Sequence, residues 1–316
     1  MRTIKKVASH IFIDGFGGMT QGLFATLIIG TMIQQIGLLI GGSTGNVIYL
    51  LGKAAAALTS AGIGVGVAVK YGESPLVTVS AAVAAMVGGY AGKITGGTFF
   101  VDGNAVLAGP GEPLGAFISA FAGITCGHLV SGKTKVDIIV TPVITIGAGS
   151  VVGLLVGPPI SQMMTGLGSI INWATEQRPF IMGIVVSVVM GMVLTLPISS
   201  AALGIILNLS GLAAGAATIG CCCNMVGFAV ASYRENKFGG LVAQGLGTSM
   251  LQVPNIMRHP LIWLPVIFSS AILGPVSTII ANMQNNATGS GMGSAGLVGQ
   301  ITTYQTMICL LYTSDA

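Results

Sequence analysis

Long runs of apolar residues restrict the fold of this 316-residue chain more than any other feature. A helix rises 1.5 Å per residue and the hydrocarbon core of a bilayer is about 30 Å thick, so about 20 apolar residues cross it. Only helices and closed barrels satisfy their backbone inside a bilayer, and the alternation typical of a barrel is absent. The predicted crossings are Met19–Gly42, Val47–Val69, Pro75–Gly92, Leu114–Val130, Ile138–Val156, Pro179–Leu196, Ala213–Ala231 and Leu261–Ala281, with a truncated one from Leu297.

Charge is too scarce for a soluble domain of ordinary composition. Lys, Arg, Asp and Glu together make up 6% of the chain, against about 25% in soluble proteins. Forty-nine glycines occur without a G-X-Y period, which excludes collagen, and the apolar content excludes disorder. The basic residues are scattered singly, so no nucleic-acid surface is predicted. We therefore expect an all-α polytopic membrane protein with about nine to ten transmembrane helices and some re-entrant or broken-helix segments.

The distribution of Lys and Arg predicts the orientation of the helices. Cytoplasmic loops carry an excess of basic residues, and three basic clusters agree with a cytoplasmic N-terminus. These clusters are Arg2 with Lys5 and Lys6, then Lys70, then Lys133 with Lys135. Arg234 and Lys237 fall on the same side only if residues 198–211 or residues 158–174 add a crossing. The sequence leaves that choice open.

The chain reads as one transmembrane domain over residues 1–308. Its first 18 residues mix charged and apolar side chains, as an amphipathic interfacial helix does. Residues 309–316, Cys-Leu-Leu-Tyr-Thr-Ser-Asp-Ala, look like the translation of a sequencing adapter. We expect this tail to be non-native.

Three segments between the predicted crossings are irregular and rich in Gly, Pro or small polar residues. They are residues 95–113, 197–210 and 282–296. Irregular backbone survives at membrane depth only where protein or a water-filled cavity satisfies it. Such interrupted segments in both halves of a chain are a sequence signal for a transporter binding site. The alternative is that they are ordinary loops outside the membrane.

Five polar residues in these segments are candidate substrate-binding residues. Ionisable groups at membrane depth are costly and commonly functional, and carboxylates can accept hydrogen bonds from substrate hydroxyls. The candidates are Asp102, Asn104, Glu112, Ser199 and Ser200. The carboxylates are alternatively solvated loop groups, and the two serines alternatively cap the next helix. No catalytic, cofactor-binding or metal-binding residue is predicted.

Three motif matches are better explained by membrane packing. Residues 127–134 fit GxxxxGK[ST], but a predicted transmembrane helix precedes them in place of the strand of a nucleotide-binding loop. Residues 291–296 fit GxGxxG, again without a preceding strand. Cys221, Cys222 and Cys223 point about 100° apart on a helix, so they cannot face one metal ion together. We expect all three to have structural roles.

Three runs together are similar to a known family. They are GPGEPLGAF (109–117), LPISSAALGI (196–205) and GMGSAGLVGQ (291–300). With the amphipathic N-terminus, they resemble the EIIC-like membrane proteins of the bacterial phosphotransferase system, closest to the branch of perfringolysin-regulator-like proteins. The resemblance implies a multi-pass protein of the bacterial inner membrane that translocates a sugar or a similar polyhydroxylated solute.

The resemblance also implies partners and a binding mode. Separate EIIA and EIIB proteins would carry the phosphoryl group, so the chain would at most be the membrane component of a phosphoenolpyruvate-dependent sugar phosphotransferase. A homodimer is also compatible with the resemblance. In that family a carboxylate and a histidine contact the sugar; by position Glu112 fits the carboxylate, whereas no histidine lies in a matching motif. Two alternatives remain, a transport-inactive membrane sensor of the same fold and an ion-coupled transporter without phosphoryl transfer.

Overall fold

The computed structural model describes residues 14–101, 103–107, 109, 111–175, 177–198, 200–207 and 209–314. Most of the predicted N-terminal amphipathic helix therefore lies outside the described residues, as do Asp102 and Ser199. The chain divides into two compact units, Met1–Met163 and Met164–Ala316. Both are built almost wholly of helices, as predicted for an all-α membrane protein. Each unit is described by itself below.

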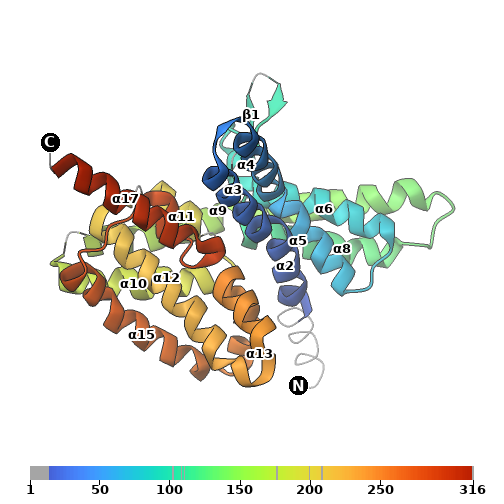
Figure 1. The fold of residues 1–316 in the computed structure, drawn as a ribbon. Coiled ribbons are helices and arrows are strands. Elements are labelled where there is room, and N and C mark those ends of the chain that lie inside the picture. The colour runs from blue at the N-terminus through green and yellow to red at the C-terminus, as the bar shows by residue number, and fades with distance from the viewer. Residues whose placement is uncertain are drawn as a thin grey trace. The chain divides into compact units, whose positions relative to one another are not determined.

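The helices of the first unit pack against one another in pairs (Figure 1). Helix α2 packs on α5, α3 on α4, and α6 on α8. A short hairpin of β1 and β2 projects from these helices, with Val101 paired to Asn104. The elements are α2 (Phe16–Leu23), the π-helix η2 (Phe24–Ile28), α3 (Ile29–Ile40), α4 (Gly42–Ala57), α5 (Thr59–Lys70), α6 (Pro75–Gly89), α7 (Ala91–Thr95), β1 (Phe100–Val101), β2 (Asn104–Ala105), α8 (Pro113–Val130) and α9 (Asp137–Thr175), whose residues after Met163 belong to the second unit.

The second unit is arranged around one buried helix, α12, which packs against α10 and α15 (Figure 1). The stretch after it is broken into short pieces of different helix types. The elements are α10 (Pro179–Thr195), α11 (Ser200–Ile206), α12 (Gly211–Ala231), α13 (Tyr233–Val242), η3 (Ala243–Gly247), η4 (Ser249–Gln252), α14 (Val253–Arg258), η5 (Pro260–Trp263), α15 (Leu264–Pro275), η6 (Val276–Ile280), α16 (Ala287–Ser290), η7 (Ala295–Leu297) and α17 (Val298–Ser314).

Glycine serves these helices by letting their backbones touch. A Cβ atom added to Gly22 in α2 would overlap the carbonyl group of Gly62 in α5, and one on Gly66 would overlap that of Gly18. In the second unit a Cβ on Gly220 would overlap the carbonyl group of Ser187. Close approach through small residues is typical of helix packing in membranes, where van der Waals contact replaces the hydrophobic drive of water. The abundance of glycine is thus a packing requirement.

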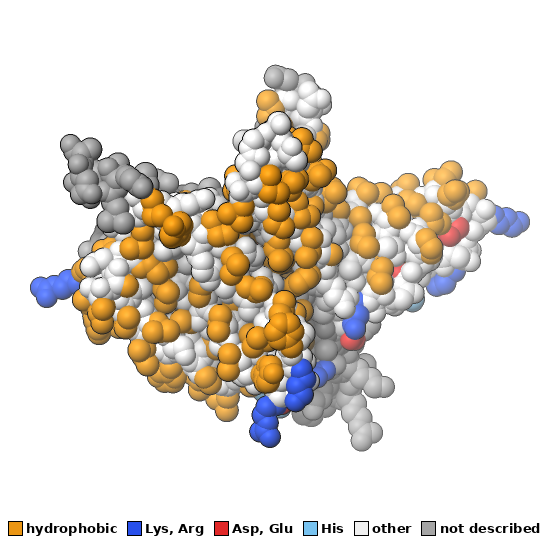
Figure 2. All heavy atoms as spheres, in the orientation of Figure 1, with side chains coloured by type: hydrophobic (Ala, Val, Ile, Leu, Met, Phe, Trp, Pro, Cys, Tyr) orange, Lys and Arg blue, Asp and Glu red, His pale blue; other side chains and the backbone are white. Residues whose placement is uncertain are grey.

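Large apolar side chains are exposed on the surface, and the buried interior, although mainly apolar, also contains many Ser, Thr, Asn and Gln side chains. Orange apolar side chains cover much of the face drawn in Figure 2, and the blue Lys and Arg side chains gather in a few places. Ile138 and Leu155 are 73% and 71% exposed, whereas Ser60 and Asn224 are fully buried. Lipid is the environment that suits such an exterior.

The prediction of nine to ten transmembrane crossings is not confirmed. Five helical stretches among the described residues are long and apolar enough to cross, or six if α4 and α5 form one span bent by 53°. The apolar helices α6 and α10 are shorter, with 15 and 17 residues. The number of candidate spans is lower than predicted because of where individual helices break and end. The predicted run 47–69 is broken at Leu58, and the predicted runs that contain α6 and α10 include residues beyond the helix ends.

Neither segment proposed as an additional crossing forms a separate helix long enough to cross in the described part of the chain. Residues 158–174 continue the helix that begins at Asp137, so they contain no turn at which the chain reverses. Helix α11 has seven residues and spans only about 10 Å. The predicted cytoplasmic side of Arg234 and Lys237 therefore gains no support from either segment.

Candidate functional site

Two helix breaks in the first unit lie next to the glycine- and proline-rich loop that the sequence singled out. Leu58, with φ −85° and ψ 9°, separates α4 from α5, and Tyr90, with φ −108° and ψ 12°, separates α6 from α7. The loop of residues 96–112 follows α7 and leads into α8. Broken helices leave backbone groups without helical partners, so other groups must satisfy them.

Tyr90 joins these breaks to the loop. Its side chain is 1% exposed, and its hydroxyl group donates a hydrogen bond to the carbonyl oxygen of Gly109. The same hydroxyl lies 3.3 Å from the carbonyl oxygen of Ala57, the last residue of α4. The ring packs against Phe99, with centroids 5.4 Å apart, and Lys93 places its ammonium group 5.4 Å from the ring centroid. Tyr90 thus lies at the break between α6 and α7 and contacts both the end of α4 and the loop before α8.

The loop enters α8 through a tightly packed turn. Gly111 has φ +77°, a conformation that favours glycine, and a Cβ atom there would overlap the hydroxyl of the buried Ser60. The backbone N–H of Glu112 donates to the carbonyl oxygen of Gly89 at 2.7 Å. Pro113 then occupies the first position of α8, where its missing N–H costs nothing. We call Ser60, Gly89, Tyr90, Gly111 and Glu112 the loop-anchor cluster.

Glu112 holds the carboxylate of this cluster at the start of α8. It occupies the N-cap position, and its Oε1 atom is buried. The N-terminus of a helix carries a partial positive charge that stabilises a nearby carboxylate. The residue implied as the sugar-binding carboxylate is therefore held at one end of an ordered helix within a packed cluster.

The hairpin holds the second described candidate of this loop. Asn104 is exposed on β2, opposite Val101 of β1, while Glu112 lies at the start of α8. Asp102 lies outside the described residues. The two described candidates of this loop thus occupy different surroundings, one exposed and one packed.

The other two familiar runs meet in the second unit. Ser200 at the start of α11 is 4% exposed, and its Oγ donates to the carbonyl oxygen of Gly291 at 2.6 Å. A Cβ on Gly291 would in turn overlap the carbonyl group of Ser200. The proton of this predicted substrate-binding hydroxyl is thus engaged by the main chain. Ser199 lies outside the described residues.

A cavity borders one of the predicted irregular segments. It has a volume of about 470 Å³ and lies in the second unit, between the start of α10 and the linker from α11 to α12. Leu207, Leu209 and Ser210 of the predicted segment 197–210 line it, together with Gln177 and Met182. The lining combines apolar walls with a few polar groups.

A buried polar cluster around Asn224 was missed from the sequence. Asn224 is fully buried in α12, and its Oδ1 atom lies 3.1 Å from Trp263 Nε1 and 3.2 Å from Thr195 Oγ1. Its Nδ2 atom donates to the carbonyl oxygen of Gly220 and to Ser270 Oγ. The sequence signal for this cluster was Asn224 itself, the one side-chain amide in the apolar run 213–231, where small packing residues dominate.

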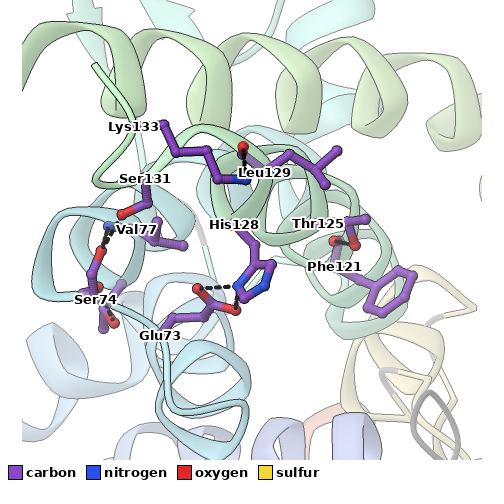
Figure 3. A network of polar contacts seen from close by, with 10 residues as sticks. Glu73, Ser74, Val77, Phe121, Thr125, His128, Leu129, Ser131 and Lys133 are labelled. Atoms are coloured by element: carbon purple, nitrogen blue, oxygen red, sulfur yellow. Dashed lines mark hydrogen bonds and ion pairs between the residues drawn. The ribbon is translucent and has the colours of Figure 1, made fainter. Parts of the chain in front are cut away.

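The GxxxxGK[ST] match forms a helix end and a turn, as expected (Figure 3). Helix α8 ends at Val130, the N–H of Gly132 donates to Asp137 Oδ1 at 2.9 Å, and Lys133 Nζ donates to the carbonyl oxygen of Leu129 at 2.7 Å. The amide and the ammonium group that would bind phosphate in a nucleotide loop are thus engaged within the chain.

The last turn of α8 holds the only histidine in the first unit's described residues. His128 Nδ1 lies 3.0 Å from Glu73 Oε1, and Ser74 Oγ lies 3.0 Å from Ser131 Oγ, which ties the α5–α6 turn to the end of α8 (Figure 3). Glu112 stands at the other end of this helix, 16 residues before His128 and about 24 Å away along the helix axis. His128 therefore does not complete the carboxylate and histidine pair that the resemblance implies.

The remaining motif matches have packing roles. Cys221 Sγ contacts the carbonyl oxygens of Met190 and Ser290, and a Cβ on Gly293 would press against Cys221. The short helix α16, and no strand, precedes the GxGxxG match. Among the described residues there is no group of three or more His, Cys, Asp or Glu side chains arranged to hold a metal ion.

Comparison with known proteins gives the family. None of the curated proteins compared with the chain matches it. A family model described as "Phosphotransferase system, EIIC" matches residues 13–313, which is nearly the whole chain and includes all three familiar runs. The match agrees with the apolar helices of both units. The chain therefore belongs to the EIIC family of phosphotransferase-system membrane transport proteins.

Proposed function

We propose that this protein is a permease that translocates a sugar or a similar small polyhydroxylated solute across the bacterial inner membrane. The observation that carries the proposal is the family match over residues 13–313. The loop-anchor cluster supports it, because it holds a carboxylate, a strong acceptor for hydroxyl groups, beside two helix breaks. Glu112 is the proposed binding carboxylate, with Asp102, Asn104, Ser199 and Ser200 as further candidates.

The proposal includes separate partners for the phosphoryl chemistry. The basic clusters favour a cytoplasmic N-terminus, which would put Lys70, Lys133 and Lys135 on the side where EIIA and EIIB proteins act. Residues 1–308 would act as one transmembrane domain. The chain itself then binds and moves the solute, and the phosphoryl group comes from the partners.

A ligand screen on purified protein tests the binding step. Each sugar or polyol is added to the detergent-solubilised protein and the unfolding temperature is measured. A ligand that binds only the folded state, at 100 times its Kd, adds about 2.7 kcal/mol of stability. We expect a raised unfolding temperature with one class of sugar and none with unrelated amino acids.

The variant Glu112→Gln then tests the site. A hydrogen bond to a charged group contributes about 1.5–3 kcal/mol, so we expect affinity for that ligand to fall by about 10- to 100-fold. Glu235→Gln, an exposed carboxylate in α13, is the matched control and should leave affinity unchanged. Equal affinities of wild type and Glu112→Gln would remove Glu112 from the site.

The two alternative functions, a transport-inactive sensor and an ion-coupled transporter, predict different results in binding and transport assays. A sensor of the same fold binds the ligand but does not exchange it across a membrane. An ion-coupled transporter accumulates unmodified solute when only a proton or sodium gradient is supplied. Uptake into proteoliposomes separates these outcomes from phosphorylation-coupled transport.

A further inference from the structure

We propose that Tyr90 is a positioning residue that fixes the Glu112 carboxylate through the loop of residues 109–112. The inference rests on the proposed function, because it concerns how the binding carboxylate is oriented. Tyr90 lies in none of the segments that the sequence singled out as irregular. It is nevertheless 1% exposed and the largest of the fully buried side chains in the described part of the chain.

Two neighbouring residues hold the two ends of this loop. The hydroxyl of Tyr90 binds the carbonyl oxygen of Gly109, and the carbonyl oxygen of Gly89 accepts from the N–H of Glu112. Only two residues separate the two anchored ends. The loop backbone is therefore attached at both ends to the same point, the end of α6.

A third contact fixes the middle of the loop. Gly111 packs against the hydroxyl of the fully buried Ser60, near the start of α5, and against the carbonyl group of Gly89. With the backbone held at Gly109, Gly111 and Glu112, little freedom is left in the direction from which the Glu112 side chain departs. Preorganised groups bind more tightly because less ordering is needed on binding.

The hydroxyl of Tyr90 also reaches the break between α4 and α5. The carbonyl oxygen of Ala57 lies in the last turn of α4, where carbonyl groups have no partner within the helix. A rotation at this 53° bend would thus pull on the same hydroxyl that holds Gly109. The geometry links the position of the carboxylate to a backbone hinge.

The variant Tyr90→Phe tests the role of the hydroxyl while retaining the ring and its contact with Phe99. We expect affinity for the ligand found in the screen to fall about 10-fold. In the double variant with Glu112→Gln, Tyr90→Phe should cause no further loss, because a misplaced carboxylate and an absent one are equivalent. Tyr71→Phe, a half-buried tyrosine after α5, is the control and should leave affinity unchanged.

The outcomes separate this inference from the proposed function. If Glu112→Gln leaves affinity unchanged, the proposed site itself is wrong. If Glu112→Gln weakens binding but Tyr90→Phe does not, or if the two losses add, Tyr90 does not act through Glu112. Should Tyr90→Phe fail to fold, Phe99→Leu loosens the Tyr90 ring from its more exposed side. A loss that does not add to that of Glu112→Gln supports the inference, and an additive or absent loss overturns it.

Discussion

Replacing Gly220 with valine is expected to prevent the second unit from folding stably. Gly220 lies in α12, the buried helix on which α10 and α15 pack. Even a single Cβ atom there would overlap the carbonyl group and the Cα atom of Ser187 in α10. Backbone cannot move aside as a side chain does, so the two helices must separate. Overpacking alone costs about 1–3 kcal/mol, and losing the helix contact adds to this.

The measurement is size-exclusion chromatography and thermal unfolding in detergent. We expect Gly220→Val to aggregate or to unfold many degrees below wild type, and Gly220→Ala to show a smaller decrease. A Cβ atom added to Gly147 in α9 would meet no atom of another described element within 4 Å, so Gly147→Ala is the control. It should be neutral or stabilising by up to about 1 kcal/mol, because alanine favours helix more than glycine. A wild-type profile for Gly220→Val would contradict the α10–α12 contact.

Replacing Asn224 with leucine is expected to have the second large effect. Leucine has the same side-chain branching as asparagine, with bulkier methyl groups in place of the amide oxygen and nitrogen, and it leaves the N–H of Trp263 and the hydroxyls of Thr195 and Ser270 with fewer partners. A buried polar group without its partner costs about 1–3 kcal/mol. We expect the free energy of unfolding to fall by about 3 kcal/mol in total, since hydrogen bonds between membrane helices are individually modest.

The indole of Trp263 provides a direct readout of this change. In Asn224→Leu its fluorescence should shift as the hydrogen bond from Nε1 is lost, together with a lower unfolding temperature. Asn46→Leu, at an exposed asparagine in α4, is the control and should change neither quantity. A stabilised Asn224→Leu protein would show that the Asn224 cluster is not required for packing.

The fold class followed from the sequence because lipid imposes a simple rule on helices. Apolar length and scarce charge are sufficient to predict an all-α membrane protein. The number of crossings could not be predicted from the sequence, because the hydropathy of a run does not show where its helix breaks. The run 47–69 remains apolar through Leu58, yet the chain bends there by 53°. The bend is visible only in the tertiary structure, where the Tyr90 hydroxyl lies 3.3 Å from the carbonyl oxygen of Ala57.

The candidate site was predictable only in part. The turn before α8 was visible because Gly111 has a conformation that favours glycine, Pro113 suits the first position of a helix, and Glu112 lies between them. Tyr90 was not visible, because an aromatic residue at the end of an apolar run is typical of a membrane interface. Ser200 was recognised as a residue at a helix break, but its partner, Gly291, is 91 residues away in the chain. Contacts at such distances cannot be read from local patterns.

Solute exchange in proteoliposomes tests the central claim most directly. Purified protein is reconstituted, and the ligand from the stability screen is followed with a radiolabel, with and without EIIA and EIIB proteins and phosphoenolpyruvate. We predict that the protein alone equilibrates the solute, that accumulation as the sugar phosphate requires the partners, and that Glu112→Gln reduces both by roughly 10-fold or more, in line with the lost charged hydrogen bond. Accumulation of unmodified solute driven by an ion gradient alone, or binding with no exchange under any condition, would contradict the proposed function.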